Sequence, residues 1–392
     1  MAERPGRRPA LNARLADFGT TIFAEMSALA VSTGAINLGQ GFPDTDGPAA
    51  VAQAAIDAIR AGHNQYPPGL GIPELRDAIA THQAHWYGLT FDPDTEVLVT
   101  AGATEAIAAT LLALCEPGDE VVTFEPYYDS YAACIAMAGA ERRVVTLRTP
   151  EYAFDPAELR DAITPRTRLL LLNSPHNPTG KVFSRTELEA IATVCTDHDL
   201  LAVTDEVYEH LTYDGVEHIP LATLPGMRDR TITISSAGKT FSFTGWKIGW
   251  VCAAPELLAA VRTAKQFLTY VNGAPFQHAI VTALGLPDSY YVDNASDLAA
   301  RRDLLTDGLG AAGFTVFPAA GTYFVTVDAA PFGATDGLTF CRQLPARCGV
   351  VAVPNSVFYD DADAGRTLVR FTFCKRPEVL AEAVDRLRAL RP

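Results

Sequence analysis

The sequence has little positive charge, no long apolar run and no paired cysteine motif. Its 392 residues carry 31 lysines and arginines against 46 aspartates and glutamates, a formal net charge of −15. Such an acidic surface repels nucleic acid and anionic membranes, so we expect neither as a partner. No window approaches a membrane span, and no apolar stretch of signal-peptide length follows the basic residues 1–8. We therefore expect a cytoplasmic protein that acts on a small molecule.

The seven cysteines are scattered without the CxxC or CxxH spacing of a metal or redox site. Several, such as Cys115, lie within apolar runs, and we interpret them as reduced core residues. No metal site is predicted. The remaining composition is that of an ordinary globular protein, and a chain of this length is expected to form two domains.

Short apolar strands alternate with helical segments through the middle of the chain. This rhythm predicts an α/β fold with a large, mostly parallel seven-stranded sheet flanked by helices on both faces. Ligands of such sheets bind at the carboxyl ends of the strands. The predicted strands are 96–100, 120–124, 143–147, 168–172, 201–204, 231–234 and 248–252, and the predicted helices between them are 104–115, 128–137 and 184–195.

The alternation ends beyond residue 287. A long polar helix is expected over roughly 290–310, and strands at 315–317, 323–327, 350–353 and 368–373 with a helix at 377–390 predict a smaller α+β domain. We therefore predict three parts of the chain. They are an N-terminal arm (1–45) packed on the small domain, a large ligand-binding domain (46–290) and a small C-terminal domain (291–392).

The stretch 235–250 contains a lysine whose setting needs a reason. Lys239 follows the apolar run 231–234 and lies in a loop rich in hydroxyls and glycines. An isolated lysine in a polar turn is usually solvated. Whether Lys239 is instead a functional lysine depends on the polar motifs at the ends of the other predicted strands.

One such motif is suited to binding an anion. Gly102, Ala103 and Thr104 follow the first predicted strand and begin a helix, where free backbone N–H groups and a hydroxyl can bind a phosphate. Ser236 and Lys247 could add a second hydroxyl and a positive charge to the same anion. They could equally be a turn hydroxyl and a surface lysine.

A second set of polar residues follows the buried strands. Asp205 ends the run 201–205, and burial of an unpaired carboxylate is costly, so a cationic partner such as a protonated ring nitrogen is expected. A helix cap or an ion pair with an arginine would serve equally well. Tyr208 follows three residues later and can face the same cleft. Asn177 lies in the loop 173–180, where two prolines restrain its amide.

These motifs, in this order, resemble the class I/II aminotransferases of pyridoxal-phosphate fold type I. The late arginine in 369–373 completes the pattern, and the similarity extends from about residue 23 to the C-terminus. The chain is similar to the kynurenine/glutamine/methionine transaminase subgroup in 38–44, 102–106 and 236–242. In 23–30, 174–180 and 370–376 it most resembles the actinobacterial N-succinyldiaminopimelate aminotransferases.

The resemblance implies pyridoxal 5'-phosphate as the cofactor. Lys239 would hold it as a Schiff base and, once released, move a proton between substrate and cofactor. Asp205 would keep the ring nitrogen protonated, and Tyr208 and Asn177 would hydrogen-bond the ring oxygen.

The resemblance also assigns the remaining cofactor contacts. Tyr128 would stack on the ring, with Tyr127 as the competing choice, and either could be a plain core aromatic. Many family members have an arginine at the position of Lys247, so a forked contact becomes a point charge. The phosphate would be held by Gly102, Ala103, Thr104, Ser236 and Lys247.

The substrate contacts follow in the same way. Arg370 would bind the substrate α-carboxylate, helped by Asn177 and the backbone of Gly41. Its alternative is a surface arginine on an edge strand. Phe23 and Tyr323 are candidates for the wall of the substrate pocket, although both could be core aromatics.

Tyr66 resembles the tyrosine that reaches the phosphate of the neighbouring subunit, which implies a homodimer with shared active sites. Three functions are compatible with these residues: a transaminase using 2-oxoglutarate, a carbon–sulfur β-lyase, and a non-enzymatic regulator. A regulator of this type would carry a DNA-binding extension, and only a short arm precedes the fold. The resemblance favours an aminotransferase, with N-succinyl-LL-diaminopimelate of lysine biosynthesis as the expected donor and a kynurenine/glutamine/methionine-type enzyme as the alternative.

Overall fold

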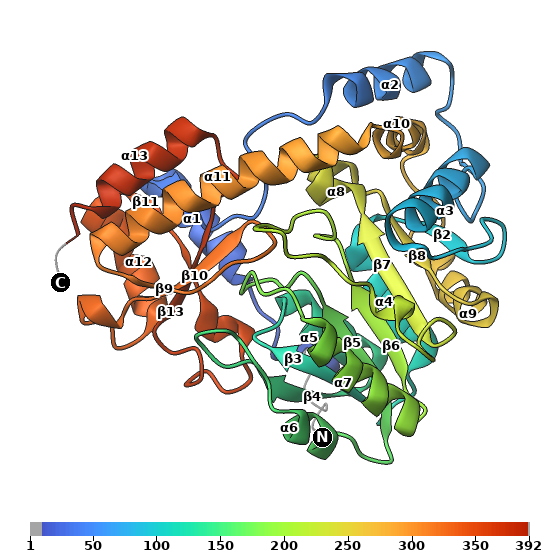
Figure 1. Ribbon diagram of the computed structural model, residues 1–392, viewed down its shortest axis with the longest axis horizontal. Helices are drawn as coiled ribbons and strands as arrows, with labels where there is room; N and C mark the ends of the chain where they lie inside the picture. Colours follow the sequence, from blue (N-terminus) through green and yellow to red (C-terminus); the bar gives the residue numbers. More distant parts are fainter. Residues whose placement is uncertain (1–9, 391–392) are drawn as a thin grey trace, which may run out of the picture.

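A seven-stranded and a four-stranded sheet, connected by one long helix and accompanied by a two-stranded sheet, organise residues 10–390, the part of the chain that the computed structural model describes (Figure 1). The larger has seven strands in the order β2-β8-β7-β6-β5-β3-β4, and β8 runs in the direction opposite to the other six. This confirms the predicted α/β fold with a mostly parallel sheet. Its strands are β2 (Val97–Thr100), β3 (Glu120–Glu125), β4 (Glu141–Thr146), β5 (Thr167–Asn173), β6 (Leu201–Asp205), β7 (Thr231–Ser236) and β8 (Gly249–Cys252).

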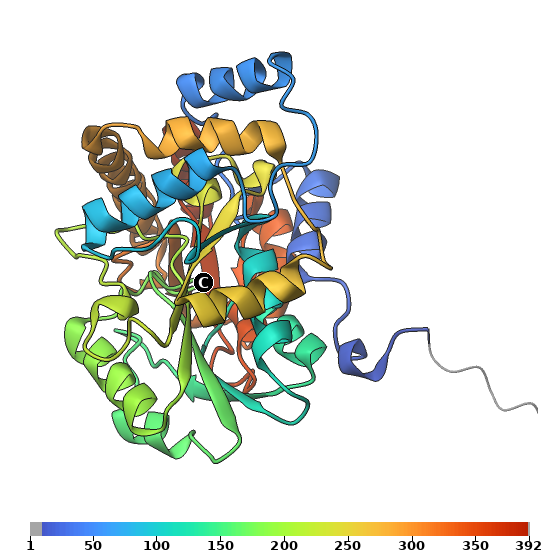
Figure 2. The same cartoon turned by 90° about the vertical axis from the view of Figure 1, so that its right-hand side faces the viewer.

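Successive strand residues of this sheet face opposite helix layers. Val122 and Leu170 pack towards α7 (Arg185–Asp197), whereas their neighbours Val121 and Leu169 pack on the other side. Figure 2 shows the two layers on either side of the sheet. The second layer consists of α4 (Gly102–Leu114), α5 (Asp129–Ala138) and α9 (Pro255–Lys265).

A third group of helices covers the β2 edge of the sheet. Helices α2 (Ala49–Arg60), α3 (Pro73–Tyr87) and α10 (Ala274–Leu284) share a core with Val99 and Trp250. The predicted helices did not include α9 and α10. A proline occupies the first turn of each, a favourable start for a helix and the signal that could have found them.

The smaller sheet is antiparallel, with the order β12-β13-β10-β9. Helix α11 (Asp288–Ala312) runs from the larger sheet to the smaller one (Figure 1) and packs there on α13 (Pro377–Leu387). The boundary predicted at 290/291 falls in the first turn of α11, and the division into domains stays a prediction. The other elements here are α12 (Gly337–Cys348), β9 (Thr315–Val316), β10 (Phe324–Asp328), β12 (Val353–Pro354) and β13 (Leu368–Thr372), and α6 (Pro156–Asp161) lies in the larger part.

The described part of the N-terminal arm lies against the smaller sheet. Thr21 caps α1 (Ile22–Thr33), which packs on α12 and on β11 (Val350–Val351). β1 (Ile36–Asn37) then pairs in parallel with β11. Residues 1–9, with the basic stretch noted in the sequence, lie outside the described residues.

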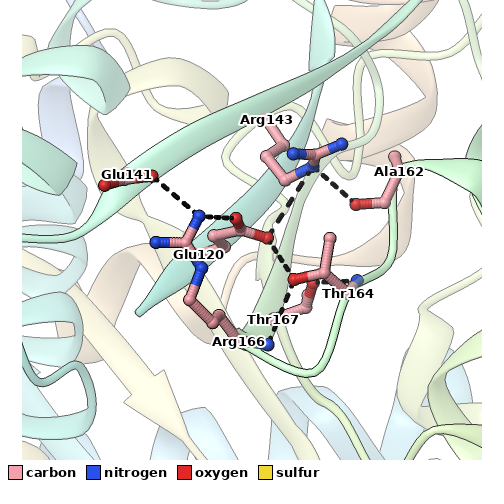
Figure 3. A network of polar contacts seen from close by, with 7 residues as sticks. All are labelled: Glu120, Glu141, Arg143, Ala162, Thr164, Arg166 and Thr167. Carbon is pink, nitrogen blue, oxygen red and sulfur yellow. Dashed lines mark hydrogen bonds and ion pairs between the residues drawn. The ribbon is translucent and has the colours of Figure 1, made fainter. Parts of the chain in front are cut away.

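A polar network balances the negative charge of a buried carboxylate at the amino end of β3 (Figure 3). Glu120 accepts hydrogen bonds of 2.6 Å from both Thr164 Oγ1 and Arg166 Nη2. Burial alone would raise the pKa of Glu120, but these hydrogen bonds and the charge of Arg166 lower it overall. The network stabilises the end of the sheet opposite to the carboxyl ends of the strands.

Six of the seven cysteines are buried and Cys348 is half-buried, which agrees with their interpretation as core residues, and none of the seven is paired with another. Within residues 10–390, no helix has both the length and the apolar character needed to cross a bilayer.

Candidate active site

A cavity of about 360 Å³ lies at the carboxyl ends of β6 and β7, between the two sheets. All of the predicted site residues line it except Tyr66 and the wall candidate Tyr323. Tyr128 is on the cavity wall, whereas the Tyr127 hydroxyl donates to Asp360 Oδ1 at 2.5 Å, outside the cavity. Tyr128 is therefore the tyrosine in position to contact a ligand.

Lys239 projects into this cavity from α8 (Ala237–Thr240), the single helical turn that follows β7. Its Nζ donates to Tyr323 Oη at 2.9 Å and to Gly41 O at 3.4 Å. Burial lowers the pKa of Lys239 from its ordinary 10.5 to about 8. Roughly a tenth of the amine is thus uncharged at pH 7, far more than for an ordinary lysine, and this form can act as a nucleophile or base.

This shift leads to a measurable pH dependence. We expect the rate at which an acid anhydride in trace amount labels Lys239 in the cofactor-free protein to reach half of its maximum near pH 8. The reason is that only the neutral amine reacts. The reference is N-acetyl-lysine amide in the same mixture, which should titrate about two pH units higher. Peptide mass spectrometry measures both, and a Lys239 midpoint equal to that of the reference would contradict the expectation.

Asp205 ends β6 and is held by a tyrosine that the sequence interpretation missed. Tyr131 Oη donates to Asp205 Oδ2 at 2.6 Å. Burial raises the pKa of Asp205 to about 6, an effect that the hydrogen bond from Tyr131 partly offsets. Tyr131 follows Tyr128 by three residues in the first turn of α5, and that spacing could have identified it. Among residues 10–390 no arginine forms an ion pair with Asp205, so the predicted alternative of an Asp205–arginine ion pair is wrong.

The start of α4 forms a cradle for an anion. Helix α4 begins at Gly102 with no side-chain cap, so its first N–H groups lack helical partners. Gly102 has φ +75°, and a Cβ built on it would lie 3.2 Å from Lys247 Nζ. A side chain at Gly249 would overlap the Gly102 backbone, so glycine there lets β8 approach the helix. Ser236 also lines the cavity, and Lys247 supplies the positive charge.

Arg370 is buried in the middle of the smaller sheet. It lies on β13 opposite Thr326 on one side and Val353 on the other, so it is not a surface arginine on an edge strand. Its Nη1 donates to Asn177 Oδ1 at 2.8 Å and its Nη2 to Gly39 O at 2.9 Å, while Nε has no partner.

Aromatic rings surround the Arg370 guanidinium. Its Cζ lies 3.9 Å from the ring centre of Phe324 and 5.2 Å from that of Phe23. Burial lowers the pKa of Arg370 to about 10, so the group remains charged at neutral pH. A buried cation with an unused donor is suited to bind a carboxylate in a forked contact.

Asn177 is oriented by its own loop, since its backbone N–H donates to Asn173 Oδ1 at 2.7 Å. Gly41 approaches the site through its backbone, and a Cβ there would lie 2.4 Å from the Phe324 ring. Tyr323 does not line the large cavity. It borders a second cavity of about 30 Å³ on the other side of Lys239, so it is not a wall of the substrate pocket.

Tyr66 lies outside the cavity of its own chain and is 81% exposed. Its ring contacts Tyr270 edge-on, with 5.5 Å between the ring centres. Phe267 and Leu268, on the loop that carries Tyr270, are exposed too. The predicted reach of Tyr66 into a neighbouring subunit stays a prediction.

The cavity fits a flat, phosphorylated ring with a reactive carbonyl. The cradle at Gly102 suits a phosphate, Tyr128 offers an aromatic face, Asp205 offers a carboxylate, and Lys239 offers an amine of lowered pKa. Arg370 remains for the carboxylate of a second molecule.

Comparison with known proteins gives consistent matches over nearly the whole chain. The family described as "Aminotransferase class I and II" matches residues 33–387. A Mycobacterium tuberculosis protein named "Probable N-succinyldiaminopimelate aminotransferase DapC" is 54% identical over 96% of this chain and 98% of its own length. The methionine aminotransferase of Escherichia coli is 38% identical over 96% of this chain and 97% of its own length.

A solved structure agrees with these sequence matches. The structure of N-succinyldiaminopimelate aminotransferase from Mycobacterium tuberculosis superimposes with a TM-score of 0.96 at 55% identity, covering 97% of this chain and all of that one. The similarity thus includes both sheets and the cavity between them.

Proposed function

Since the chain belongs to the class I and II aminotransferase family, we propose that it uses pyridoxal 5'-phosphate to transfer the amino group of N-succinyl-LL-diaminopimelate to 2-oxoglutarate. The observation that carries the choice of donor is the 54% identity, over nearly the full length of both chains, to a relative with that name. The arrangement of side chains in the cavity supports the cofactor.

Bound pyridoxal phosphate supplies the electron sink that makes the substrate α-hydrogen acidic. Lys239 would attach it, and the released ε-amine of Lys239 would take the proton from the substrate α-carbon and hold it for its return. Asp205, held by Tyr131, would keep a proton on the ring nitrogen. Tyr208 and Asn177 would donate to the ring oxygen.

The remaining contacts orient the two molecules. Tyr128 would stack on the ring, and Arg370 would bind the substrate carboxylate beside Gly41 and Phe23, since all of them line the cavity. The residues that would hold the phosphate are Gly102, Ala103, Thr104, Ser236 and Lys247.

The exposed aromatic surface around Tyr66 supports a homodimer. Tyr66, Phe267 and Tyr270 expose between 52% and 82% of their surface, which is unusual for a group of large apolar side chains. A second copy of the chain that covers this surface would bring Tyr66 towards the other subunit's phosphate. The cytoplasm is the proposed location.

A substrate panel tests the proposed donor. We expect the purified, cofactor-loaded enzyme to form glutamate from N-succinyl-LL-diaminopimelate and 2-oxoglutarate with a higher kcat/KM than from methionine, glutamine or kynurenine. The Lys239→Ala variant is the blank. Rapid turnover of the other donors with no response to N-succinyl-LL-diaminopimelate would overturn the assignment. Release of pyruvate from cystathionine without an acceptor would instead indicate a β-lyase.

A further inference from the structure

We propose that Tyr323 is a positioning residue for the reaction: it holds the free ε-amino group of Lys239 so that the nitrogen lone pair faces the cavity. The proposal rests on the proposed catalytic role of Lys239. It assigns a role to a tyrosine that lines neither the cofactor cradle nor the substrate wall.

Two oxygens accept hydrogen bonds from the ε-amino group of Lys239. Lys239 Nζ lies 2.9 Å from Tyr323 Oη and 3.4 Å from Gly41 O. The Tyr323 hydroxyl donates its own proton to the same Gly41 carbonyl. Because that proton is committed, Tyr323 Oη can only accept a hydrogen bond from the lysine. The three groups form a chain with one direction, from amine to hydroxyl to carbonyl.

The number of N–H bonds on the neutral amine then determines the direction of its lone pair. A neutral primary amine has two N–H bonds and one lone pair, and here both N–H bonds have an acceptor. The lone pair takes the remaining direction. Lys239 lines both cavities, and Tyr323 Oη lies on the side of the small one, so we infer that the remaining direction is that of the large cavity. This is the state in which the amine can remove a proton from a bound substrate. Without Tyr323 Oη, the amine would lose its nearer acceptor and could rotate its lone pair away.

The tyrosine is itself held firmly. Tyr323 is 1% exposed, and its ring packs edge-on against Tyr208, with 5.3 Å between the ring centres, and against Phe324. Its carbonyl accepts from the Phe373 N–H at 2.9 Å, which ties the segment before β10 to the end of β13. A hydroxyl on a ring packed this way has a fixed position, as precise orientation of a catalytic amine requires.

The variant Tyr323→Phe removes one oxygen and leaves the ring. We expect kcat to fall about 10- to 100-fold, with the KM of the amino donor changed less than about threefold, because the amine is misoriented while the substrate contacts persist. With an α-deuterated donor, the primary isotope effect on kcat should increase as proton transfer becomes slower. The donor is whichever one of the panel the wild type uses fastest.

A second readout needs no activity. In the cofactor-free protein, the labelling midpoint of Lys239 should fall in Tyr323→Phe, because loss of the accepting oxygen destabilises the ammonium form. A wild type that turns over no donor would refute the proposed function, and the labelling midpoint would still decide on Tyr323.

Tyr213→Phe is the matched control. Tyr213 is also buried, and its hydroxyl donates to Thr322 O, next to Tyr323, without touching Lys239. We expect its kcat, isotope effect and labelling midpoint to stay close to wild type. A folded Tyr323→Phe enzyme that matches this control in all three measurements would overturn the proposal.

If Tyr323→Phe fails to fold, 3-fluorotyrosine incorporated at position 323 keeps the ring and the hydroxyl while weakening the oxygen as an acceptor. The midpoint and kcat should then shift in the same directions by a smaller amount. Values equal to wild type in this protein would equally overturn the proposal.

Discussion

Replacement of Lys239 by alanine is expected to lower kcat at least about a thousandfold, because the change removes both the covalent attachment and the base. The long-wavelength absorbance of the cofactor-loaded enzyme should disappear as well. Steady-state kinetics and an absorbance spectrum of the purified variant measure the two effects. Retained turnover in Lys239→Ala would refute the central assignment of the site.

Lys181→Ala provides the control for this experiment. Lys181 pairs with Glu187 at 2.7 Å and does not line the cavity. Its loss removes a lysine and an ion pair without touching the proposed chemistry, so kcat should remain within about twofold of wild type.

Replacement of Arg370 by lysine is the change with the second largest expected effect. Lysine keeps the charge, but it cannot form the fork of hydrogen bonds that Arg370 directs to Asn177 and Gly39 while leaving Nε free. We expect kcat/KM for the amino donor to fall about 100-fold, which corresponds to roughly 3 kcal/mol and lies within the range for a buried charged contact.

A comparison of substrates separates this loss from general damage. The wild type should strongly prefer the amino donor over its analogue without the α-carboxylate, and Arg370→Lys should lose most of that preference. Thermal denaturation of the variant checks the stability of the smaller sheet. An unchanged preference in a stable variant would contradict the assigned role of Arg370.

The sequence identified the cavity because the topology of a parallel sheet fixes where it lies. Gly102, Asp205 and Ser236 each follow or end a strand, and the order of β2, β8, β7 and β6 brings these positions to one edge of the sheet. The late arginine was recognised through the residues around it, since an isolated arginine in a strand carries no comparable signal.

Contacts between distant side chains could not be predicted in the same way. Tyr131 and Asp205 are 74 residues apart, and Tyr323 and Lys239 are 84 apart. The helical spacing from Tyr128 can mark Tyr131 as a site residue, but which group each of the two hydroxyls contacts depends on how the aromatic rings pack, and no local pattern encodes that. Tyr127 and Tyr128 present the same difficulty, since adjacent aromatics point to different sides and only the start of α5 decides which one reaches the cavity.

Lys239 follows β7 of the larger sheet, whereas Arg370 belongs to β13 of the smaller one. A substrate bound at both ends is therefore a removable crosslink between the two sheets. The binding free energy of the substrate favours the distance between the sheets at which the contacts near Lys239 and at Arg370 both form. When the product leaves, the sheets are no longer held at that distance. An amine without a carboxylate would contact only one sheet, so we expect it to bind without narrowing the range of spacings that the protein samples.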